Sequence, residues 1–274
     1  MKFTIITSTF NCSKTINKTV KSIRRQIENG SDVQWIIVDG LSTDSTLEVL
    51  NENIDIIDKL IVESDEGIYD AWNKAVKNIN GDWVIFMGSG DTFNSNSTLV
   101  EVENFLKFID ATEFKIVYGN VSLVDADNNS LDIYEEIKSN DYSNGRPPLP
   151  PHQGTFQHKD LFCDEKTFDD SYKIAADSKF LFLALRNTKI KYIPLMISNM
   201  EIMGVSTNPK LILRTKKEID KLRKDISLII PKYSIFIFNV KCYAKHLFYN
   251  YFPLSCANSL ANFYRKLTGR TGIY

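Results

Sequence analysis

Several familiar signals are missing from this chain. Its four cysteines, at positions 12, 163, 242 and 256, contain no Cys-x-x-Cys pair. Their wide spacing supports neither a zinc site nor a disulfide framework, and it favours a reducing compartment. No apolar run reaches the roughly 18–20 residues of a membrane span, and the N-terminus does not resemble a signal peptide. We expect a globular protein of the cytoplasm.

Net charge is nearly absent overall, but the two signs are unevenly distributed. The 274 residues carry a net charge of −1, and 43% of them are hydrophobic, which is enough for a sizeable core. From position 209 onward thirteen Lys and Arg face three acids, a net charge of +10, so the remainder carries −11. The acidic remainder argues against a nucleic-acid groove, and the basic end predicts an anionic partner.

Buried strands alternate with helices in the first third of the chain. Apolar runs over 3–7, 35–38, 60–62 and 83–87 predict strands. Helices are expected over 14–28, with Ser13 as cap, from Thr43 or Asp44 to about 54, and over 69–77. Strands that are apolar on both faces and alternate with helices predict a mostly parallel α/β sheet with helices on each side.

The rest of the chain is less regular. We predict helices over 99–109 and 175–185, and strands over 116–118, 121–124 and 191–193, with a hairpin turn at 127–130. Residues 138–155 look irregular, and a long loop is more often functional than spare. A basic helix is expected over 209–224. The apolar, aromatic and basic segment that follows is interrupted at Pro231 and Pro253, a pattern typical of binding to a membrane surface.

Polar residues gather where predicted strands end. Asp65 precedes the helix that carries Lys74, and a Gly-Ser-Gly-Asp loop ending at Asp91 follows the strand over 83–87. Open α/β sheets bind ligands at the carboxyl ends of their strands. Two carboxylates and an ammonium group there indicate a site for a metal-bound phosphate ligand.

Four motifs follow one another along the chain: Ser8-Thr9-Phe10-Asn11, the stretch Val38-Asp39-Gly40-x-Ser42-Thr43-Asp44-x-Thr46, the Gly67-to-Lys74 stretch, and Gly88-Ser89-Gly90-Asp91. In this order and spacing they resemble the inverting family 2 glycosyltransferases. They look closest to the bacterial branch that builds O-antigens, capsules and exopolysaccharides. The resemblance covers about the first two hundred residues and implies a glycosyltransferase-A, Rossmann-like fold. It divides the chain into a nucleotide-sugar half (1–110), an acceptor half (111–207) and a helical, membrane-associating extension (208–274).

The resemblance also implies roles for single residues. The first loop would touch the nucleotide, with the Phe10 ring against the base, and Asp39 would hold the base's imide nitrogen. The nucleotide-binding set it implies is Ser8, Phe10, Asn11, Asp39, Asp65, Asn73, Lys74, Ser89 and Gly90.

The family's metal motif is usually Asp-x-Asp, and here only Asp91 of it is present. One carboxylate, with diphosphate oxygens and water, would then hold Mn²⁺ or Mg²⁺.

The acceptor half carries three further matches. Asp177 stands where the family places its general base, at the start of a helix. His152-Gln153 resembles a His-Gln pair before the acceptor region, and Gly204-x-Ser206 resembles a closing loop. Inversion at a sugar carbon needs one base and a neutralised leaving group, without the paired acids of glycoside hydrolases.

The sequence therefore predicts a metal-dependent, inverting hexosyltransferase on the inner face of the cell membrane. It would move a sugar from a nucleotide donor, with UDP preferred, to a lipid-diphosphate-linked glycan in O-antigen, lipopolysaccharide or capsule synthesis. Two alternatives stay open. A nucleotidyltransferase should carry a basic Gly-rich loop after its first strand, and this chain lacks one. A non-catalytic nucleotide-sugar-binding partner would explain the missing metal acids.

Each candidate residue also has a structural alternative. Asp39 also fits a cap of the turn before the second helix, Asp91 a loop acid, Asp177 an acid at a helix N-terminus, and Phe10 a core position. Asp65 and Lys74 also fit solvated charges, and the basic tail fits a solvated helical face that packs on the body. His152 fits a plain loop histidine, and His158 and His246 are expected to be structural or surface residues.

Overall fold

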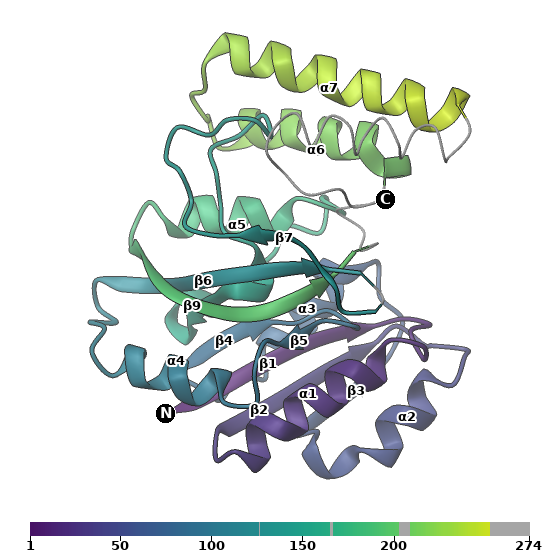
Figure 1. The fold of residues 1–274 in the computed structure, drawn as a ribbon, viewed down its shortest axis with the longest axis vertical. Coiled ribbons are helices and arrows are strands. Elements are labelled where there is room, and N and C mark those ends of the chain that lie inside the picture. The colour runs from purple at the N-terminus through teal and green to yellow at the C-terminus, as the bar shows by residue number, and fades with distance from the viewer. Residues whose placement is uncertain (126, 165–166, 203–208, 253–274) are drawn as a thin grey trace. The chain divides into compact units, whose positions relative to one another are not determined.

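The computed structural model describes residues 1–125, 127–164, 167–202 and 209–252. The chain forms two compact units (Figure 1). The first comprises Met1–Val121 and Pro150–Met200, and the second comprises Ser122–Leu149 and the chain from Glu201 onward. Each unit is described separately below.

Four parallel strands form the first half of the sheet in the first unit. They are β1 (Lys2–Thr9), β2 (Asp32–Asp39), β3 (Lys59–Val62) and β4 (Trp83–Phe86), in the order β3-β2-β1-β4. Thr9 is aligned with Asp39, and Asp39 with Val62, so three strands end at one edge. The predicted α/β fold with a parallel sheet is confirmed for this half.

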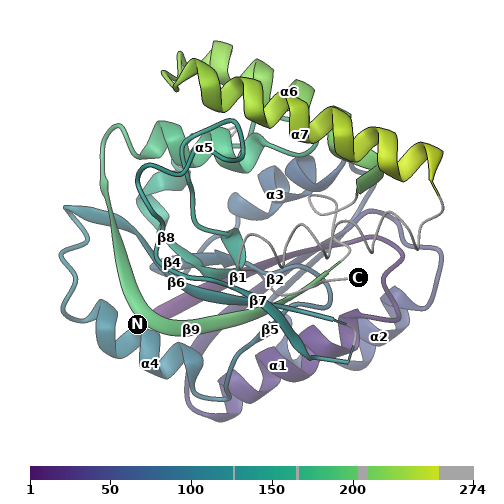
Figure 2. The same cartoon turned by 45° about the horizontal axis from the view of Figure 1, so that its top comes forward.

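Helices cover both faces of this sheet, as predicted. They are α1 (Ile16–Glu28), α2 (Thr46–Glu52), α3 (Ile68–Val76), α4 (Thr98–Leu106) and α5 (Ala176–Ala184), with a short 3₁₀ turn, η1, at Ile54–Ile56. In Figures 1 and 2 α1, α2 and α4 lie on one face, and α3 and α5 on the other. The first face is closed by buried apolar residues such as Ile16, Val20 and Ile23 of α1. Their spacing of three and four residues forms one helical stripe.

The helix starts differ slightly from the prediction. The N-cap of α1 is Thr15, so the predicted capping role of Ser13 is wrong. The N-cap of α2 is Ser45, while Asp44 accepts hydrogen bonds from the Thr46 amide and hydroxyl, at 3.0 and 2.5 Å.

The second half of the sheet is antiparallel, which makes the sheet mixed. Beyond β4 the order continues through β8 (Thr155–His158), β6 (Phe114–Val124), β9 (Lys189–Glu201) and β5 (Thr92–Phe93). Two 3₁₀ turns, η2 (His152–Gly154) and η3 (Lys159–Phe162), flank β8. The short strands β5 and β8 were not predicted, and β9 is longer than expected.

The strand β6 is continuous where the sequence predicted two strands. Gly119 stands at the predicted break, but a Cβ there would lie 2.6 Å from the Leu195 carbonyl oxygen. The glycine therefore marks a close approach of β9 and not a strand end.

The second unit contains β7 (Ser130–Tyr134), η4 (Pro209–Leu211), α6 (Ile212–Asp225) and α7 (Lys232–Tyr251). β7 pairs with β6 after a turn in which Asn129 donates to Asp125, and α6 and α7 pack side by side (Figures 1 and 2). Pro231 does not interrupt a helix but caps the start of α7. Within the described part of the chain, no helix has the length and apolarity needed to cross a membrane.

The segment Ser122–Leu149 belongs to the same compact unit as the C-terminal helices. The sequence-based division placed it in the acceptor half. Which ligand each part binds stays a prediction.

Candidate active site

Asp39 ties together the ends of two strands. Its carboxylate is fully buried. Oδ2 accepts hydrogen bonds from the Thr9 and Ser42 hydroxyls, both at 2.7 Å, and Oδ1 accepts from the Ser42 amide, also at 2.7 Å. Asp39 thus joins the end of β1 to the turn after β2. The predicted contact with a base stays a prediction, and it would add to this structural role.

Phe10, Gly40 and Asp65 meet at the same edge of the sheet. A Cβ at Gly40 would lie 2.5 Å from Asp65 Oδ2 and 3.5 Å from the Phe10 ring. Phe10 is 64% exposed, so the core position considered above is excluded. Asp65 Oδ1 accepts from the Gly67 amide at 2.9 Å, which fixes the entry to α3. The ends of β1, β2 and β3 therefore present an exposed ring beside a carboxylate.

Asn11 and Ser8, the two other residues predicted for the first loop, differ in exposure: Asn11 is exposed and Ser8 is half-buried. Asn11 has a left-handed backbone with φ 48°, and its side-chain oxygen accepts from the Thr43 amide at 2.8 Å. It joins the loops after β1 and β2. Ser8 is half-buried within β1.

Lys74 and Asn73 are engaged by protein groups. The Lys74 ammonium lies 3.1 Å from both Glu63 and Asp70 and donates to the Ser64 carbonyl at 2.6 Å. Burial acts to lower the pKa of Lys74, but the hydrogen bonds with the two carboxylates outweigh it and raise that pKa. The Asn73 amide forms two 2.8 Å hydrogen bonds with the Phe168 backbone. Both residues stabilise the framework here, and their predicted contacts with a nucleotide stay predictions.

The loop after β4 folds back on itself around Asp91. Asp91 Oδ2 accepts from the Gly88 amide at 2.9 Å, and a Cβ at Gly88 would lie 2.7 Å from that oxygen. Gly90 adopts φ +100°, which favours glycine. Its amide donates to the Thr19 hydroxyl of α1 at 2.9 Å, and the Ser89 hydroxyl lies 2.8 Å from that of Thr15. The loop is therefore held in place from α1.

Asp91 could hold a metal ion only with help from a substrate. Among the residues that the structure describes, no cluster of three or more His, Cys, Asp or Glu side chains is placed to bind a metal. Mg²⁺ commonly binds through one or two carboxylates together with substrate phosphates. The single carboxylate of Asp91 fits that mode of binding, with substrate phosphates as the other ligands.

The carboxylate of Asp177 is held from two other elements. One oxygen, Oδ2, makes a short contact with His152 Nε2 in η2. The other, Oδ1, lies 3.2 Å from the Tyr69 hydroxyl of α3, which is also 2.7 Å from the Ile174 carbonyl oxygen. Because a hydroxyl carries one proton, it donates to only one of these two oxygens at a time. The orientation of the Asp177 carboxylate is thus fixed by protein groups, and its predicted role as the base stays a prediction.

His152 is itself positioned by aromatic rings. The Trp72 and Phe86 rings meet it edge-on, at centroid distances of 5.5 and 6.4 Å. Within the described residues, the buried Nδ1 atom has no hydrogen-bond partner. The Nε2 atom is therefore the ring nitrogen that ties His152 to Asp177. His152 is therefore packed against rings and paired with Asp177, and its predicted role beside the acceptor stays a prediction.

His152 contacts Phe86, the last residue of β4. The His152–Asp177 pair therefore lies near the end of β4, where the loop to Asp91 begins. Besides the Tyr69–Asp177 contact, hydrogen bonds hold the segment from 168 to 177 against α3 and the turn before it. They include the Asn73–Phe168 bonds, the Tyr69–Ile174 bond and a 2.6 Å bond from the Lys173 ammonium to the Glu66 carbonyl. The sequence prediction missed Tyr69, although its place two residues after Gly67 was a usable signal.

Of the two remaining residues predicted on the acceptor side, Gln153 is described by the structure and Ser206 is not. The Gln153 carbonyl accepts from the Ser198 hydroxyl at 2.6 Å, which ties η2 to β9. Ser206 lies outside the described residues, so its predicted role is untested.

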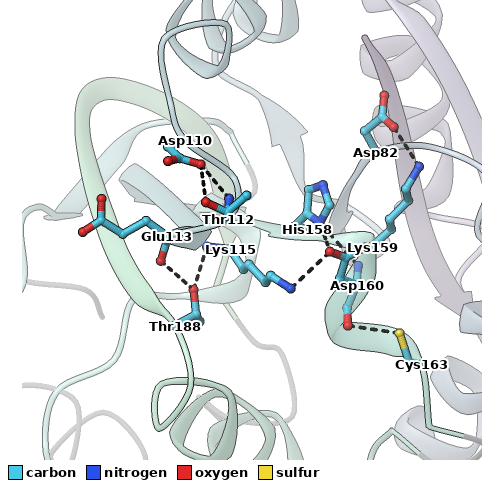
Figure 3. A network of polar contacts seen from close by, with 10 residues as sticks. All are labelled: Asp82, Asp110, Thr112, Glu113, Lys115, His158, Lys159, Asp160, Cys163 and Thr188. Carbon is cyan, nitrogen blue, oxygen red and sulfur yellow. Dashed lines mark hydrogen bonds and ion pairs between the residues drawn. The ribbon is translucent and has the colours of Figure 1, made fainter.

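His158 belongs to a separate polar network (Figure 3). It packs edge-on against Trp83 at 5.3 Å, and Asp160 pairs with Lys115 at 3.1 Å. Burial lowers the pKa of His158, and Lys115 and Lys159 lower it further against the opposing effect of Asp160. The predicted structural role of His158 agrees with these contacts. A cavity of about 610 Å³ borders this network, lined by Lys115, Asp160 and one face of α5 that excludes Asp177.

Comparison with known proteins identifies the family. The profile of glycosyl transferase family 2 matches residues 4–175. The chain is 26% identical over 214 residues to the PGL/p-HBAD biosynthesis glycosyltransferase of Mycobacterium bovis (strain BCG / Pasteur 1173P2), covering 75% of this chain and 79% of that protein.

Solved structures share the fold. S. aureus TarS 1-349 in complex with UDP matches with a TM-score of 0.60 and 18% identity, over 96% of this chain and 78% of that one. The mannosyltransferase PcManGT from Pyrobaculum calidifontis, in complex with GDP-Man and Mn²⁺, matches with a TM-score of 0.61 and 17% identity, over 97% and 80%. The family match spans more than half of the chain, and the glycosyltransferase-A fold agrees with it. The chain thus belongs to glycosyl transferase family 2.

Proposed function

We propose that this enzyme transfers a sugar, with inversion, from a nucleotide sugar to a hydroxyl of a lipid-diphosphate-linked glycan. The observation that carries the proposal is the Asp177 carboxylate, held by His152 and by Tyr69 near the end of β4. A fixed carboxylate at that edge of the sheet suits a base acting on an incoming hydroxyl.

The donor would lie along the ends of β1 to β4. The exposed Phe10 ring offers a stacking surface for a base, and Asp65 lies beside it. A UDP-sugar is the preferred donor, because TarS binds UDP and UDP-GlcNAc in its solved complexes. The relatives named for PGL/p-HBAD biosynthesis and for poly(ribitol-phosphate) glucosylation favour an acceptor in a bacterial surface glycan.

Asp91 would hold Mn²⁺ or Mg²⁺ together with the donor's diphosphate. The PcManGT complex with Mn²⁺ and the glucosyl-3-phosphoglycerate synthase complex with Mg²⁺ support a divalent cation. When bound, such a cation neutralises the charge that develops on the leaving diphosphate. The backbone bonds from Gly88 and the support from α1 keep Asp91 in place.

Asp177 would take the acceptor proton. As the acceptor oxygen bonds to the sugar carbon, the bond from that carbon to the diphosphate oxygen breaks on the opposite face. The hydroxyl proton passes to Asp177, and the electron pair leaves with the nucleoside diphosphate. His152 and Tyr69 would keep the carboxylate aimed at the hydroxyl, which makes them positioning residues.

The decisive test is Asp177→Asn, measured in two assays. We expect transfer to a lipid-linked acceptor to fall by about 10²–10⁴-fold, while donor binding, measured by thermal shift with manganese, is kept. Glu48→Gln, on the exposed surface of α2, is the matched control and should leave both unchanged.

A panel of UDP- and GDP-sugars, each with and without manganese, comes first and identifies the donor. Retained turnover in Asp177→Asn would exclude this residue as the base. If no donor shifts the melting temperature and none is transferred to a lipid-linked acceptor, the chain is a non-catalytic partner.

The proposed setting is the cytoplasmic face of the cell membrane, where a lipid-linked acceptor would be presented. The C-terminal helices would make the attachment.

A further inference from the structure

Helix α7 is apolar on two opposite sides. One side is buried and contains Ser234, Phe238 and Cys242, spaced four residues apart. The Phe238 ring fills the space next to Gly145, where a Cβ would overlap it. This side attaches α7 to the rest of its own unit.

The opposite side of α7 faces solvent. Six apolar or aromatic residues lie there at helical spacing: Tyr233, Phe236, Val240, Tyr243, Leu247 and Tyr251. We name them the outer stripe. Phe236 is 69% exposed and Tyr251 is 76% exposed. At 100° per residue these positions cluster around the direction opposite Phe238.

A contiguous exposed apolar patch on a folded protein marks an interaction surface. The outer stripe is therefore expected to be covered by a binding partner. The charge of α6 and α7 distinguishes between two partners, a second copy of this chain and an anionic bilayer.

The charge of the helix pair favours an anionic occupant. The α7 sequence has three lysines and no acid, and that of α6 has six Lys and Arg against three acids. Two copies of this chain joined through the stripe would bring like charges together, which opposes association. Lipid headgroups of an anionic bilayer complement the same charges.

The kinds of side chain point the same way. Tyr and Phe dominate the stripe, and aromatic residues concentrate at the boundary between lipid chains and water. At 100° per residue Lys232 borders the stripe, and its side chain can extend to phosphate while the stripe enters the membrane. Lys241 and Lys245 lie within about 60° of Phe238, on the side away from the stripe.

We propose that the outer stripe of α7 lies in the headgroup region of an anionic bilayer, parallel to its surface. This inference rests on the proposed function for the lipid-linked acceptor, and it names the surface that meets the lipid. The stripe would enter about 5–10 Å deep, as amphipathic interfacial helices do.

A tryptophan placed in the stripe tests the proposal in the full chain. The three native tryptophans, Trp35, Trp72 and Trp83, are at most 8% exposed, so they give a background shielded from lipid. In Phe236→Trp we expect quenching by brominated phosphatidylglycerol vesicles and little by brominated phosphatidylcholine vesicles. Phe108→Trp is the control, because Phe108 is 90% exposed in the first unit. Equal quenching of both variants would overturn the proposal.

Loss of binding gives a second measurement. Phe236→Ser with Leu247→Ser should weaken sedimentation with phosphatidylglycerol vesicles at least tenfold, and Phe108→Ser should not. Both changes are on exposed positions, so an unchanged melting temperature verifies the fold. Unchanged vesicle binding would overturn the proposal. So would a wild-type dimer in the absence of lipid that the double variant converts to monomers, because the stripe would then join two copies of the chain.

Transfer to a lipid-free acceptor separates this inference from the proposed function. Transfer without vesicle binding would overturn the lipid surface alone. Stripe-dependent vesicle binding by a chain that uses no donor would overturn the function alone.

Discussion

At Gly40 the lack of a side chain decides where Asp65 can lie. A Cβ at position 40 would come within 2.5 Å of the Asp65 carboxylate, which cannot stay in place. We expect Gly40→Ala to displace Asp65 and to weaken nucleotide binding, measured by calorimetry with UDP and manganese.

A double-mutant cycle checks that this effect passes through Asp65. Asp65→Ala removes the clash, so Gly40→Ala should cost little further affinity in that background. We expect a coupling energy of about 0.5–3 kcal/mol between the two changes. Simple addition of the two losses would mean that Gly40 matters for another reason.

His158 gives a dependence of stability on pH. Burial holds its pKa below the usual 6.5, while the unfolded chain titrates near that value. Below about pH 6.5 the unfolded state therefore binds more protons, and the free energy of unfolding falls as the pH drops towards the folded-state pKa.

Replacing the imidazole should remove that contribution. We expect His158→Gln to flatten the loss of unfolding free energy between about pH 7 and pH 5, measured by urea denaturation. His246→Gln on α7 serves as the control and should keep the wild-type slope. A steeper loss in His158→Gln would contradict the assigned direction.

Single site residues were partly predictable from the sequence. Asp39, Asp91 and Asp177 stand in motifs, and the motifs placed each of them at a strand end or helix start. The partner of Asn73 was not predictable, because it is the Phe168 backbone, almost a hundred positions away along the chain. The pairing of His152 with Asp177 depends on a similar long-range contact.

At the scale of elements, α3 supports the segment that carries Asp177. Asn73 satisfies both the amide and the carbonyl of Phe168, whose own side chain is fully buried. We expect Asn73→Ala to lower the free energy of unfolding by about 1–3 kcal/mol for each backbone group left unpaired. Urea denaturation measures this change.

Asn104→Ala on the exposed face of α4 is the matched control, expected within about 0.5 kcal/mol of the wild type. Unchanged stability in Asn73→Ala, with a loss of affinity for the donor, would instead support the nucleotide contact that the family resemblance implies.

Elements with a clear period were predicted well, and short ones were not. The stripes of α1 and the apolar runs of β1 to β4 depend on local sequence. β5 has two residues and β8 has four, and each is stabilised by pairing with distant strands. β6 was predicted as two strands, because the sequence does not show that Leu195 lies beside Gly119.

For the whole molecule, alternation of strands and helices predicted the parallel half of the sheet. In the antiparallel half, strands pair with partners far away along the chain, as β8 does with β4. The composition of the sequence does not indicate such pairings. The charge asymmetry was visible from the sequence, but the outer stripe was not. Pro231 suggested an interruption, whereas the structure uses it to start a helix of twenty residues.

Gly145 lies in a segment that seemed independent of the C-terminal helices. Its backbone adopts φ +69° and packs against Phe238 of α7, and its carbonyl accepts a 3.0 Å hydrogen bond from Arg223 of α6. The loop that carries Gly145 and both helices therefore depend on one another. A chimera that took α6 and α7 from a relative but kept residues 122–149 would lose both contacts of Gly145, so the two parts have to be replaced together.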